Sequence, residues 1–542
     1  MELKEKVVAM KRYIKYLTLA LLSVVSLGCI ENDIPYPVVK LEILGVEAEG
    51  LTSPAKIDVA NKSVTLEFEE TTDIRNAVIT DITVTEGATT SLELPMCVDL
   101  RIPLYVDLSM HYSWEWSIVG KQNIERYFRV EGQIGDSTID SEHHIATALV
   151  PMDFDLTKVN ITALKLGPKD ITTYSTDPKT LTNFENTARY ITVRYHNDIS
   201  EDWTLRIIPT DVEVSFKSVD AWAKRIWLSA EGRSGAEFSF KYRKAGSEEW
   251  ITVQNITVDG GSFSACVEGL DTLTDYEVIA YSNDSFTPIV KVTTEDVWTL
   301  PNAGFEEWSV NDKGVICPYL PGAEPFWGTG NDGAAIASTT LTEATEDTRP
   351  GSTGEYAAAL QSKKAAVMGL GKFAAGNIFL GEFGGLVGMD GLVNFGRPST
   401  ARPVALRGWI KYNCGAIDEY GKTPTARPDI QKGDMDEGQI MIAVGNWTAE
   451  EYGGSESCPV VVNTKNESTF LDPKGKNVIG SGVMILKEST NGWKEFTLPL
   501  EYATTSERPT HIIIVCTGSR FGDYFTGSTQ SLLLVDDFEL IY

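Results

Sequence analysis

The stretch LPNAGFEEWS, residues 300–309, reads as the start of a domain, although it lies well inside the chain. Its Pro-Asn-Ala-Gly portion is typical of a turn, and an aromatic residue, two adjacent acids and a tryptophan follow at once. We expect Gly304 to lie in the turn, and Phe305 and Trp308 to pack inward. The stretch therefore predicts a domain boundary near residue 297 and raises the question of what its acids do.

The length and charge limit the kinds of protein that this chain can be. With 542 residues it is too long for one hydrophobic core, so several domains are expected. Its formal net charge is −29, whereas binding to nucleic acid needs a basic surface, so we expect no nucleic-acid partner. An acidic surface is compatible with neutral ligands and with divalent cations. The seven cysteines are scattered and form no CxxC pair, which argues against a zinc ribbon.

Short alternating strands dominate the chain. Segments such as KSVTLEFEE (62–70), RYITVRYH (189–196) and THIIIVCT (510–517) alternate apolar and polar residues, and long helical periodicity is nearly absent. The pattern predicts an all-β chain. We expect tandem immunoglobulin-like and fibronectin III-like sandwiches, followed by a C-terminal β-jelly roll.

Two of the predicted sandwiches repeat one another. An offset of 82 residues places Glu49-Gly50 on Glu131-Gly132, and each copy ends in a strand led by a tryptophan, Trp114 and Trp203. We interpret the pair as a tandem duplication. The predicted divisions are a signal peptide (1–28), an acidic linker (29–36), two immunoglobulin-like domains (37–124 and 125–210), a fibronectin type III-like domain (211–296) and a jelly-roll domain (297–542).

Residues 211–296 resemble a fibronectin type III domain. The family motif Leu-x-x-x-Thr-x-Tyr-x-Val is matched by Leu270, Thr274, Tyr276 and Val278. The resemblance implies that Tyr276 is the corner tyrosine, whose hydroxyl ties its strand to nearby backbone. It also implies that Tyr242 and Trp250 are core aromatics.

The N-terminus resembles a bacterial lipoprotein signal. Basic residues precede an apolar run, LTLALLSVVSL (17–27), which is too short to span a bilayer, and SLGC then ends at Cys29. The resemblance implies that Cys29 is lipidated. The acidic IEND that follows (30–33) resembles the signal that sends lipoproteins of Bacteroidota to the outer face of the outer membrane. A solvated linker is the alternative reading of IEND.

The two ends of the last domain resemble those of many carbohydrate-binding jelly rolls. They begin with Asn-x-Gly-Phe-Glu and end with a strand that bears Asp-Asp, as in LLLVDDFELIY (532–542). In those modules the two ends hold a structural calcium ion, which prefers six to eight oxygen ligands. The resemblance implies that Glu306 and Asp536 are ligands, with Asp537 as the alternative to Asp536. Solvated strand ends are the other reading of these acids.

Several further motifs narrow the resemblance. PNAGFEEW, GNIFLGEF, GRPSTARPVALRGWIKY, GDYFTG and LLVDDFELIY together resemble the putative carbohydrate metabolism domain of Bacteroidota lipoproteins. The resemblance covers essentially all of residues 297–542. One departure is Ser399, which stands where an aromatic residue is expected before the Ala-Arg-Pro segment.

No catalytic residue is assigned from the sequence. His511 is the sole histidine of the last domain and reads as structural, which leaves no Ser-His-Asp site, although a glycosidase needs only two carboxylates. Sugar binding uses exposed aromatic faces beside polar groups, and Trp308 and Trp409 are instead expected in the core. The candidate glycan-binding residues are Tyr319, Trp327, Asn331, Asp332, Tyr420, Trp447, Arg520, Asp523 and Tyr524.

These observations favour a lipid-anchored surface protein of the outer membrane. Its terminal jelly roll is expected to bind a neutral poly- or oligosaccharide without chemistry, for polysaccharide capture. Two alternatives stay open. One is a glycoside hydrolase or lyase that works through carboxylates, and the other is an adhesin or envelope scaffold that binds a protein.

Overall fold

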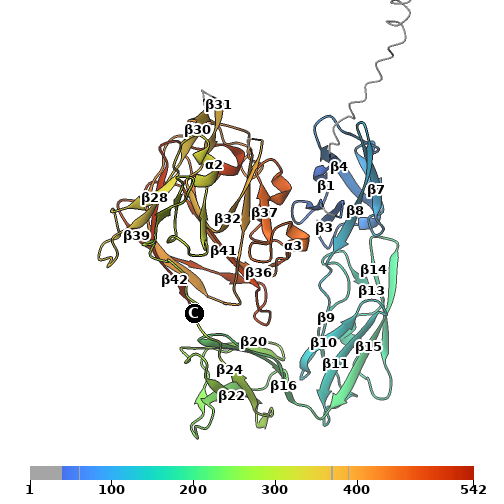
Figure 1. Cartoon of the computed structure of the whole chain (residues 1–542). Coiled ribbons are helices and arrows are strands. Elements are labelled where there is room, and N and C mark those ends of the chain that lie inside the picture. The colour runs from blue at the N-terminus through green and yellow to red at the C-terminus, as the bar shows by residue number, and fades with distance from the viewer. Residues whose placement is uncertain (1–39, 60, 368–369, 389) are drawn as a thin grey trace, which may run out of the picture. The chain divides into compact units, whose positions relative to one another are not determined.

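A computed structural model describes residues 40–59, 61–367, 370–388 and 390–542, and it confirms that the chain is all-β (Figure 1). The chain divides into two compact units, Met1–Gln122 and Asn123–Tyr542. The predicted signal peptide, Cys29 and the acidic linker lie outside the described residues. Within the described part, no helix is long and apolar enough to cross a membrane.

The described part of the first unit is a two-sheet sandwich around a tryptophan core. Trp116 is 1% exposed, and its indole Nε1 donates to the carbonyl of Leu41 at 2.9 Å. One sheet has the strand order β1 (Ile43–Ala48), β4 (Ala77–Val84), β6 (Met96–Val98). The other has the order β2 (Lys56–Asp58), β3 (Ser63–Phe68), β8 (Ser113–Gln122), β7 (Leu104–Ser109), β5 (Thr89–Thr90).

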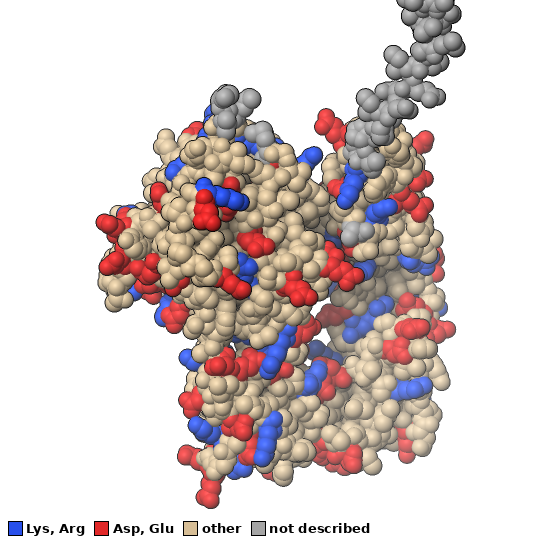
Figure 2. Space-filling model, in the orientation of Figure 1, with Lys and Arg blue, Asp and Glu red and all other residues tan. Residues whose placement is uncertain are grey.

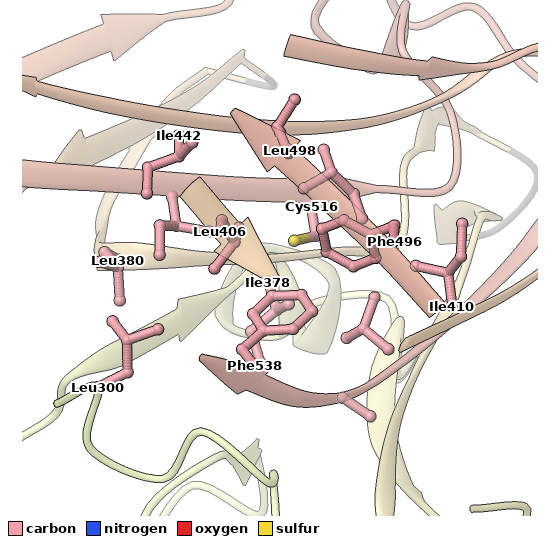
Figure 3. Close-up of a cluster of buried hydrophobic side chains, with 14 of the residues drawn as sticks. Leu300, Ile378, Leu380, Leu406, Ile410, Ile442, Phe496, Leu498, Cys516 and Phe538 are labelled. Atoms are coloured by element: carbon pink, nitrogen blue, oxygen red, sulfur yellow. The ribbon is translucent and has the colours of Figure 1, made fainter. Parts of the chain in front are cut away.

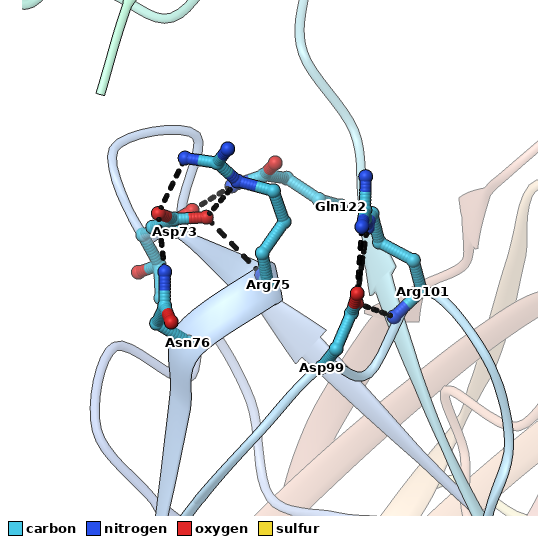
Figure 4. Close-up of polar contacts among 7 residues, drawn as sticks. Asp73, Arg75, Asn76, Asp99, Arg101 and Gln122 are labelled. Atoms are coloured by element: carbon cyan, nitrogen blue, oxygen red, sulfur yellow. Dashed lines mark hydrogen bonds and ion pairs between the residues drawn. The ribbon is translucent and has the colours of Figure 1, made fainter. Parts of the chain in front are cut away.

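Polar side chains close the turn before β4 (Figure 4). Asp73 accepts from Nε of Arg75 at 2.8 Å and from Nδ2 of Asn76 at 3.0 Å, and the hydrogen bonds from Arg75 hold its pKa well below the usual range. Gln122 donates to the carbonyl of Thr72 at 2.7 Å, which ties the end of β8 to the same turn. The first unit therefore has its own hydrophobic core, and side-chain hydrogen bonds fix the turn before β4.

The second unit contains three groups of strands, which we name the second sandwich, the third sandwich and the C-terminal sandwich. In the second sandwich one sheet is β10 (Ile134–Asp140), β11 (Ile145–Pro151), β15 (Ile199–Thr210), β14 (Arg189–Tyr195), β13 (Thr173–Tyr174), and the other pairs β12 (Ile161–Lys165) with β9 (Tyr127–Val130). In the third sandwich one sheet is β16 (Val214–Ala221), β17 (Arg225–Gly232), β21 (Ser262–Glu268), β20 (Thr257–Asp259). Its other sheet is β19 (Ile251–Thr252), β18 (Phe238–Lys244), β22 (Asp275–Ser282), β23 (Ser285–Phe286), with β24 (Val290–Thr293) also on β22.

Two predictions for the third sandwich can be checked on its side chains. The Tyr276 hydroxyl accepts a hydrogen bond from the backbone amide of Asp271 at 3.1 Å, so it ties β22 to the preceding turn as expected. Tyr242 packs against the core of this sandwich. The prediction for Trp250 is wrong, because its ring lies half-buried beneath the guanidinium of Arg243, 4.4 Å away.

The C-terminal sandwich packs a nine-stranded sheet against a five-stranded sheet. The larger sheet has the order β37 (Val460–Asn463), β33 (Asp390–Phe395), β32 (Asn377–Val387), β41 (His511–Thr517), β36 (Gly438–Gly445), β38 (Val478–Leu486), β40 (Glu501–Tyr502), with β27 (Trp327–Thr329) on β32 and β34 (Arg397–Pro398) on β41. The smaller sheet is β28 (Thr342–Thr345), β29 (Ala357–Gln361), β42 (Leu532–Ile541), β35 (Ala405–Asn413), β39 (Lys494–Pro499). Short pairs are β25 (Ser309–Val310) with β26 (Ile316–Cys317) and β30 (Lys363–Val367) with β31 (Leu370–Ala374), and the helices are α2 (Asn331–Ala335) and α3 (Ala449–Tyr452).

Alternating residues of both sheets fill the space between them (Figure 3). Ile378 and Leu380 of β32 face Leu406 of β35, and all three are fully buried. Burial of one such side chain stabilises the fold by about 1.5–3 kcal/mol. The alternation that predicted the strands therefore also supplies the core.

The opening stretch is a turn followed by extended chain rather than a strand. Phe305 is fully buried against Trp327 and Phe538, as predicted, and Trp308 packs at the edge of the same core. The amide of Phe538 donates to the carbonyl of Ala303 at 2.9 Å, so the two ends of the domain do meet.

Candidate functional site

Three loops gather at one end of the C-terminal sandwich, and we name them the loop cluster (residues 414–437, 464–471 and 518–531). The first loop joins β35 to β36, and the third joins β41 to β42. Because β35 is antiparallel to β42 and β36 is antiparallel to β41, both loops leave the sheets at the same end. The amide of Gly527 donates to the carbonyl of Glu419 at 3.1 Å, which joins the two loops directly.

Asp436 is the buried anchor of the loop cluster. Its side chain is fully buried and accepts from Oγ of Ser519 at 2.6 Å, from Oγ of Ser531 at 2.8 Å and from the amide of Ser528 at 2.8 Å. Burial raises the pKa of Asp436 to about 6, and these hydrogen bonds offset part of the rise. Asp436 therefore shapes the loops and is closed to a ligand.

Glu437, which follows Asp436 in the chain, lies between two arginines. One carboxylate oxygen accepts from Nη1 of Arg427 and the other from Nη1 of Arg520, both at 3.0 Å. The Glu437 side chain is only 8% exposed, whereas both arginines remain partly open to solvent. Charge-assisted bonds of this kind hold the guanidinium groups in place, with N–H groups still directed to the surface.

Asp523 and Tyr524 are neighbours in the third loop, but only Asp523 is exposed, because Tyr524 is 7% exposed and packs in a small core with Ile417, Ile430 and Phe521. The Tyr524 hydroxyl donates to the carboxylate of Glu467, and the ammonium of Lys422 lies 5.4 Å from the Tyr524 ring. Asp523 is exposed, yet the surrounding loops withdraw enough water to raise its pKa to about 6, and Lys422 offsets part of that rise. The arrangement places an exposed acid and an ammonium group side by side, and the Tyr524 ring next to the ammonium group is buried.

Two hairpins border the loop cluster. Lys372 of β31 lies 3.9 Å from the Phe525 ring and forms a 2.7 Å ion pair with Asp390 of β33. Thr464 joins the hairpin to the cluster, because its Oγ1 accepts from the amide of Gly391 and its carbonyl accepts from Lys422 at 3.4 Å. A second lysine and a second ring therefore stand beside Tyr524.

The loop cluster offers both donors and acceptors of hydrogen bonds. Sugar hydroxyls donate and accept hydrogen bonds, and the cluster offers ammonium, guanidinium and carboxylate groups together. Sites for small ligands typically pair such polar groups with aromatic walls. The cluster contains both basic and acidic groups. On the face of the molecule shown in Figure 2, acidic side chains are likewise spread among basic ones.

The structure brings four of the nine predicted glycan-binding residues into the loop cluster. They are Tyr420, Arg520, Asp523 and Tyr524. Tyr420 is 37% exposed, and its hydroxyl is hydrogen bonded to the carbonyl of Ile430 at 3.0 Å. Tyr319 and Asp332 lie elsewhere, beside β26 and in α2. The pKa of Tyr319 is raised because its hydroxyl is desolvated.

Four of the predicted residues are buried, so the prediction is wrong for them, and one of the four is Tyr524, which is 7% exposed. Trp327 is fully buried and donates from Nε1 to the carbonyl of Pro301 at 2.8 Å. Asn331 is 2% exposed, and its amide group organises the backbone around Thr342. Trp447 is 3% exposed in a small core that covers the outer face of β36 and β41. None of these side chains offers a face to a sugar.

Sequence reasoning missed Lys372, Lys422 and Phe525. Nothing in the local sequence marks the two lysines, because lysines in loops are ordinary and the rings near them are brought close only by folding. The GDYFTG motif (522–527), which carries three of the residues found here, was the one available signal. Trp409 was also placed wrongly, since it lies half-buried on the outer face of β35 with the Arg349 guanidinium 5.4 Å away.

The predicted calcium ligands lie around a loop that covers the outer face of β42, residues 346–356. Asp536 is fully buried and accepts from the amide of Arg349 at 3.0 Å, and Asp537 accepts from Nε of Arg349 at 2.5 Å. Glu306 accepts from the amides of Glu355 at 2.8 Å and Tyr356 at 3.2 Å. The loop is therefore held from both ends of the domain.

The fit of these residues to a cation differs from one to the next. Asp536 fits, because its Oδ1 is buried without a hydrogen-bond partner, and burial raises its pKa to about 6. Asp537 fits less well, because Arg349 already neutralises it. Among the described residues no three His, Cys, Asp or Glu side chains gather as a metal site, so backbone carbonyls would have to supply most of the ligands.

Comparison with known proteins gives the following likenesses. A putative glycoside hydrolase from Bacteroides thetaiotaomicron is 16% identical over 94% of this chain and 98% of its own, with a TM-score of 0.30. A putative glycoside hydrolase from Bacteroides vulgatus is 22% identical over 44% of this chain and 96% of its own, with a TM-score of 0.33. No curated protein matches the chain. Residues 304–541 match the family model of the putative carbohydrate metabolism domain, so the C-terminal sandwich is a carbohydrate-related domain.

Proposed function

We propose that the C-terminal sandwich binds a neutral glycan at the loop cluster and releases it unchanged. The match of residues 304–541 to a carbohydrate-related family supports a sugar ligand. The observation that carries the position of the site is the exposed Asp523 carboxyl beside Lys422, in a loop cluster whose Tyr420 ring is 37% exposed.

A glycoside hydrolase or lyase is the second candidate, and one observation favours it. Asp523 is open to solvent and has a pKa raised to about 6, which suits a general acid near neutral pH. Glu467 would have to serve as the second carboxylate. It already accepts hydrogen bonds from the hydroxyls of Tyr524 and Thr425, so both donors occupy one of its oxygens. We therefore favour binding.

Calorimetry with neutral polysaccharides on residues 30–542 tests the proposal. Lys422→Ala and Asp523→Asn should each weaken binding about tenfold, since each removes a charged hydrogen-bonding group. Glu539→Gln is the control, because it removes an exposed ion pair with Arg407 on the five-stranded sheet. Equal affinity in all four proteins would place the ligand elsewhere. Release of reducing sugar that Asp523→Asn abolishes would replace binding by hydrolysis.

We also propose that Cys29 carries the lipid that anchors the protein to the outer membrane, with the domains exposed to the outside. The signal-like sequence that ends at Cys29 supports this proposal. Metabolic labelling with a palmitate analogue should mark the wild-type protein and leave Cys29→Ser unmarked. Equal labelling of both proteins would contradict the anchor. The third reading, an adhesin, would be favoured if no glycan bound and a protein ligand were captured through the loop cluster.

A structural calcium ion between Glu306 and Asp536 is our proposal for the two ends of the domain. The unpartnered Oδ1 of Asp536 supports it. When bound, the ion would neutralise a carboxylate that is otherwise desolvated, and it would hold residues 346–356 against β42. Asp537 and Arg349 already hold this loop without it.

A further inference from the structure

The third sandwich meets the C-terminal sandwich through a polar seam built around Arg402. Its guanidinium donates from Nη2 to Glu295 Oε1 at 2.7 Å and from Nε to Glu295 Oε2 at 3.2 Å, across the boundary between the two sandwiches. It also donates to the carbonyls of Ala221 and Thr505, each at 2.8 Å. Arg402 is only 3% exposed, so this is a buried charge whose partners come from both sides.

Trp222 is the apolar half of the seam. It belongs to the third sandwich by sequence and is 2% exposed. Its indole donates to the carbonyl of Thr505 at 2.9 Å, and its ring lies 4.6 Å from Tyr502 of β40. The Arg402 guanidinium lies 5.0 Å from the same ring. Separation of the two sandwiches would expose this tryptophan.

Hydrogen bonds hold the segment that connects the two sandwiches. The amide of Glu295 donates to the carbonyl of Trp222, and the carbonyl of Trp298 accepts from the hydroxyl of Tyr542 at 2.8 Å. Leu300, only a few residues further on, is already in the core of the C-terminal sandwich. The linker is therefore tied down on both sides.

We infer that residues 211–542 move as one rigid body and unfold together. The Arg402–Glu295 ion pair joins the third sandwich to the C-terminal sandwich. Glu295 also forms an ion pair with Arg508 at 2.8 Å, so opening of the seam would break two ion pairs, the hydrogen bond from Arg402 to Ala221 and the contacts of Trp222 with Thr505 and Tyr502. The third sandwich is then a fixed support of the carbohydrate-related domain, and it holds the loop cluster in one orientation. This inference does not depend on the proposed ligand.

Hydrogen exchange on the full mature chain tests the inference. Arg402→Ala should speed exchange of amides in residues 219–224 of the third sandwich by about tenfold or more, although the substitution lies in the other sandwich. Glu295→Gln, in the segment after the third sandwich, should likewise speed amide exchange in residues 500–506 of the C-terminal sandwich. Arg407→Ala is the matched control, because that arginine forms an exposed ion pair with Glu539.

Two outcomes would overturn the inference. One is faster exchange that stays within the sandwich that carries the substitution, for both Arg402→Ala and Glu295→Gln. The other is protease cleavage of the wild-type chain between residues 294 and 300 that leaves both fragments folded and separate. If Arg402→Ala fails to fold, Glu295→Gln and Arg402→Lys, which keeps the charge but loses the bidentate fork, answer the same question.

Discussion

Solvent does not reach the Asp436 side chain, and four hydrogen bonds hold it, the three described above and one from the amide of Glu437 at 2.9 Å. We expect Asp436→Asn to lower the free energy of unfolding by about 3 kcal/mol, because the new amide group would face donors where an acceptor is needed. Urea denaturation measures the loss. Asp429→Asn is the control, since Asp429 lies in the same loop with its side chain 75% exposed. Equal losses in both variants would contradict the anchoring role.

We expect Asp536 to couple the stability of the domain to pH and, if the proposed ion binds, to calcium. Its pKa is raised to about 6 in the folded protein, above the usual value near 4 in the unfolded chain, so the folded state binds the proton more tightly. In chelator, its contribution to stability is therefore full below about pH 4 and is lost as the pH rises through about 6. Asp536→Asn should remove this part of the pH dependence, as thermal unfolding across the range will measure.

Calcium binding at pH 7 should offset the loss of stability that the buried Asp536 charge causes. We expect added calcium to raise the melting temperature of the wild-type protein and to leave Asp536→Asn unchanged. Glu306→Ala is a second variant with a different signature, because Glu306 also caps two amides and its loss should cost about 1 kcal/mol even in chelator. A wild-type melting temperature that is the same with and without calcium would exclude the metal site.

At the scale of the element, the strand β22 shows what a sequence motif can specify. Tyr276→Phe should cost about 1 kcal/mol, since it deletes only the hydrogen bond from the Asp271 amide. Tyr281→Phe in the same strand is the control and should cost less than about 0.5 kcal/mol. Denaturant titration compares the two. A loss for Tyr281→Phe as large as that for Tyr276→Phe would show that the corner bond is not special.

The hairpins of the C-terminal sandwich show what a motif leaves open. Their alternation predicts strands, but Lys372 of β31 reaches Phe525 and Asp390 of β33 only because folding brings these separate segments together. In the same way, the alternation of β36 and β41 predicts two faces without saying that the Trp447 core covers the outer one. Local pattern therefore marks the strands, and long-range packing selects the exposed residues.

At the scale of the whole molecule, the net charge of −29 bears on the choice of ligand. A neutral glycan has no charge to be screened, so its affinity should change by less than about twofold between about 50 and about 500 mM salt. Calorimetry at the two salt concentrations measures this. Affinity that falls steeply with salt would indicate an anionic ligand and a local basic surface instead.

The sequence by itself determined the all-β class, which rests on alternation, and its resemblance to known families implied the tie made by Tyr276 and the meeting of the two ends of the last domain. It also brought Tyr420, Arg520, Asp523 and Tyr524 into the list of site candidates. Tertiary structure alone decided that Trp327 and Trp447 are core and that Lys372 and Lys422 stand at the surface. The physical reason is that exposure depends on what covers a face, and the covering segments here lie far away in the chain.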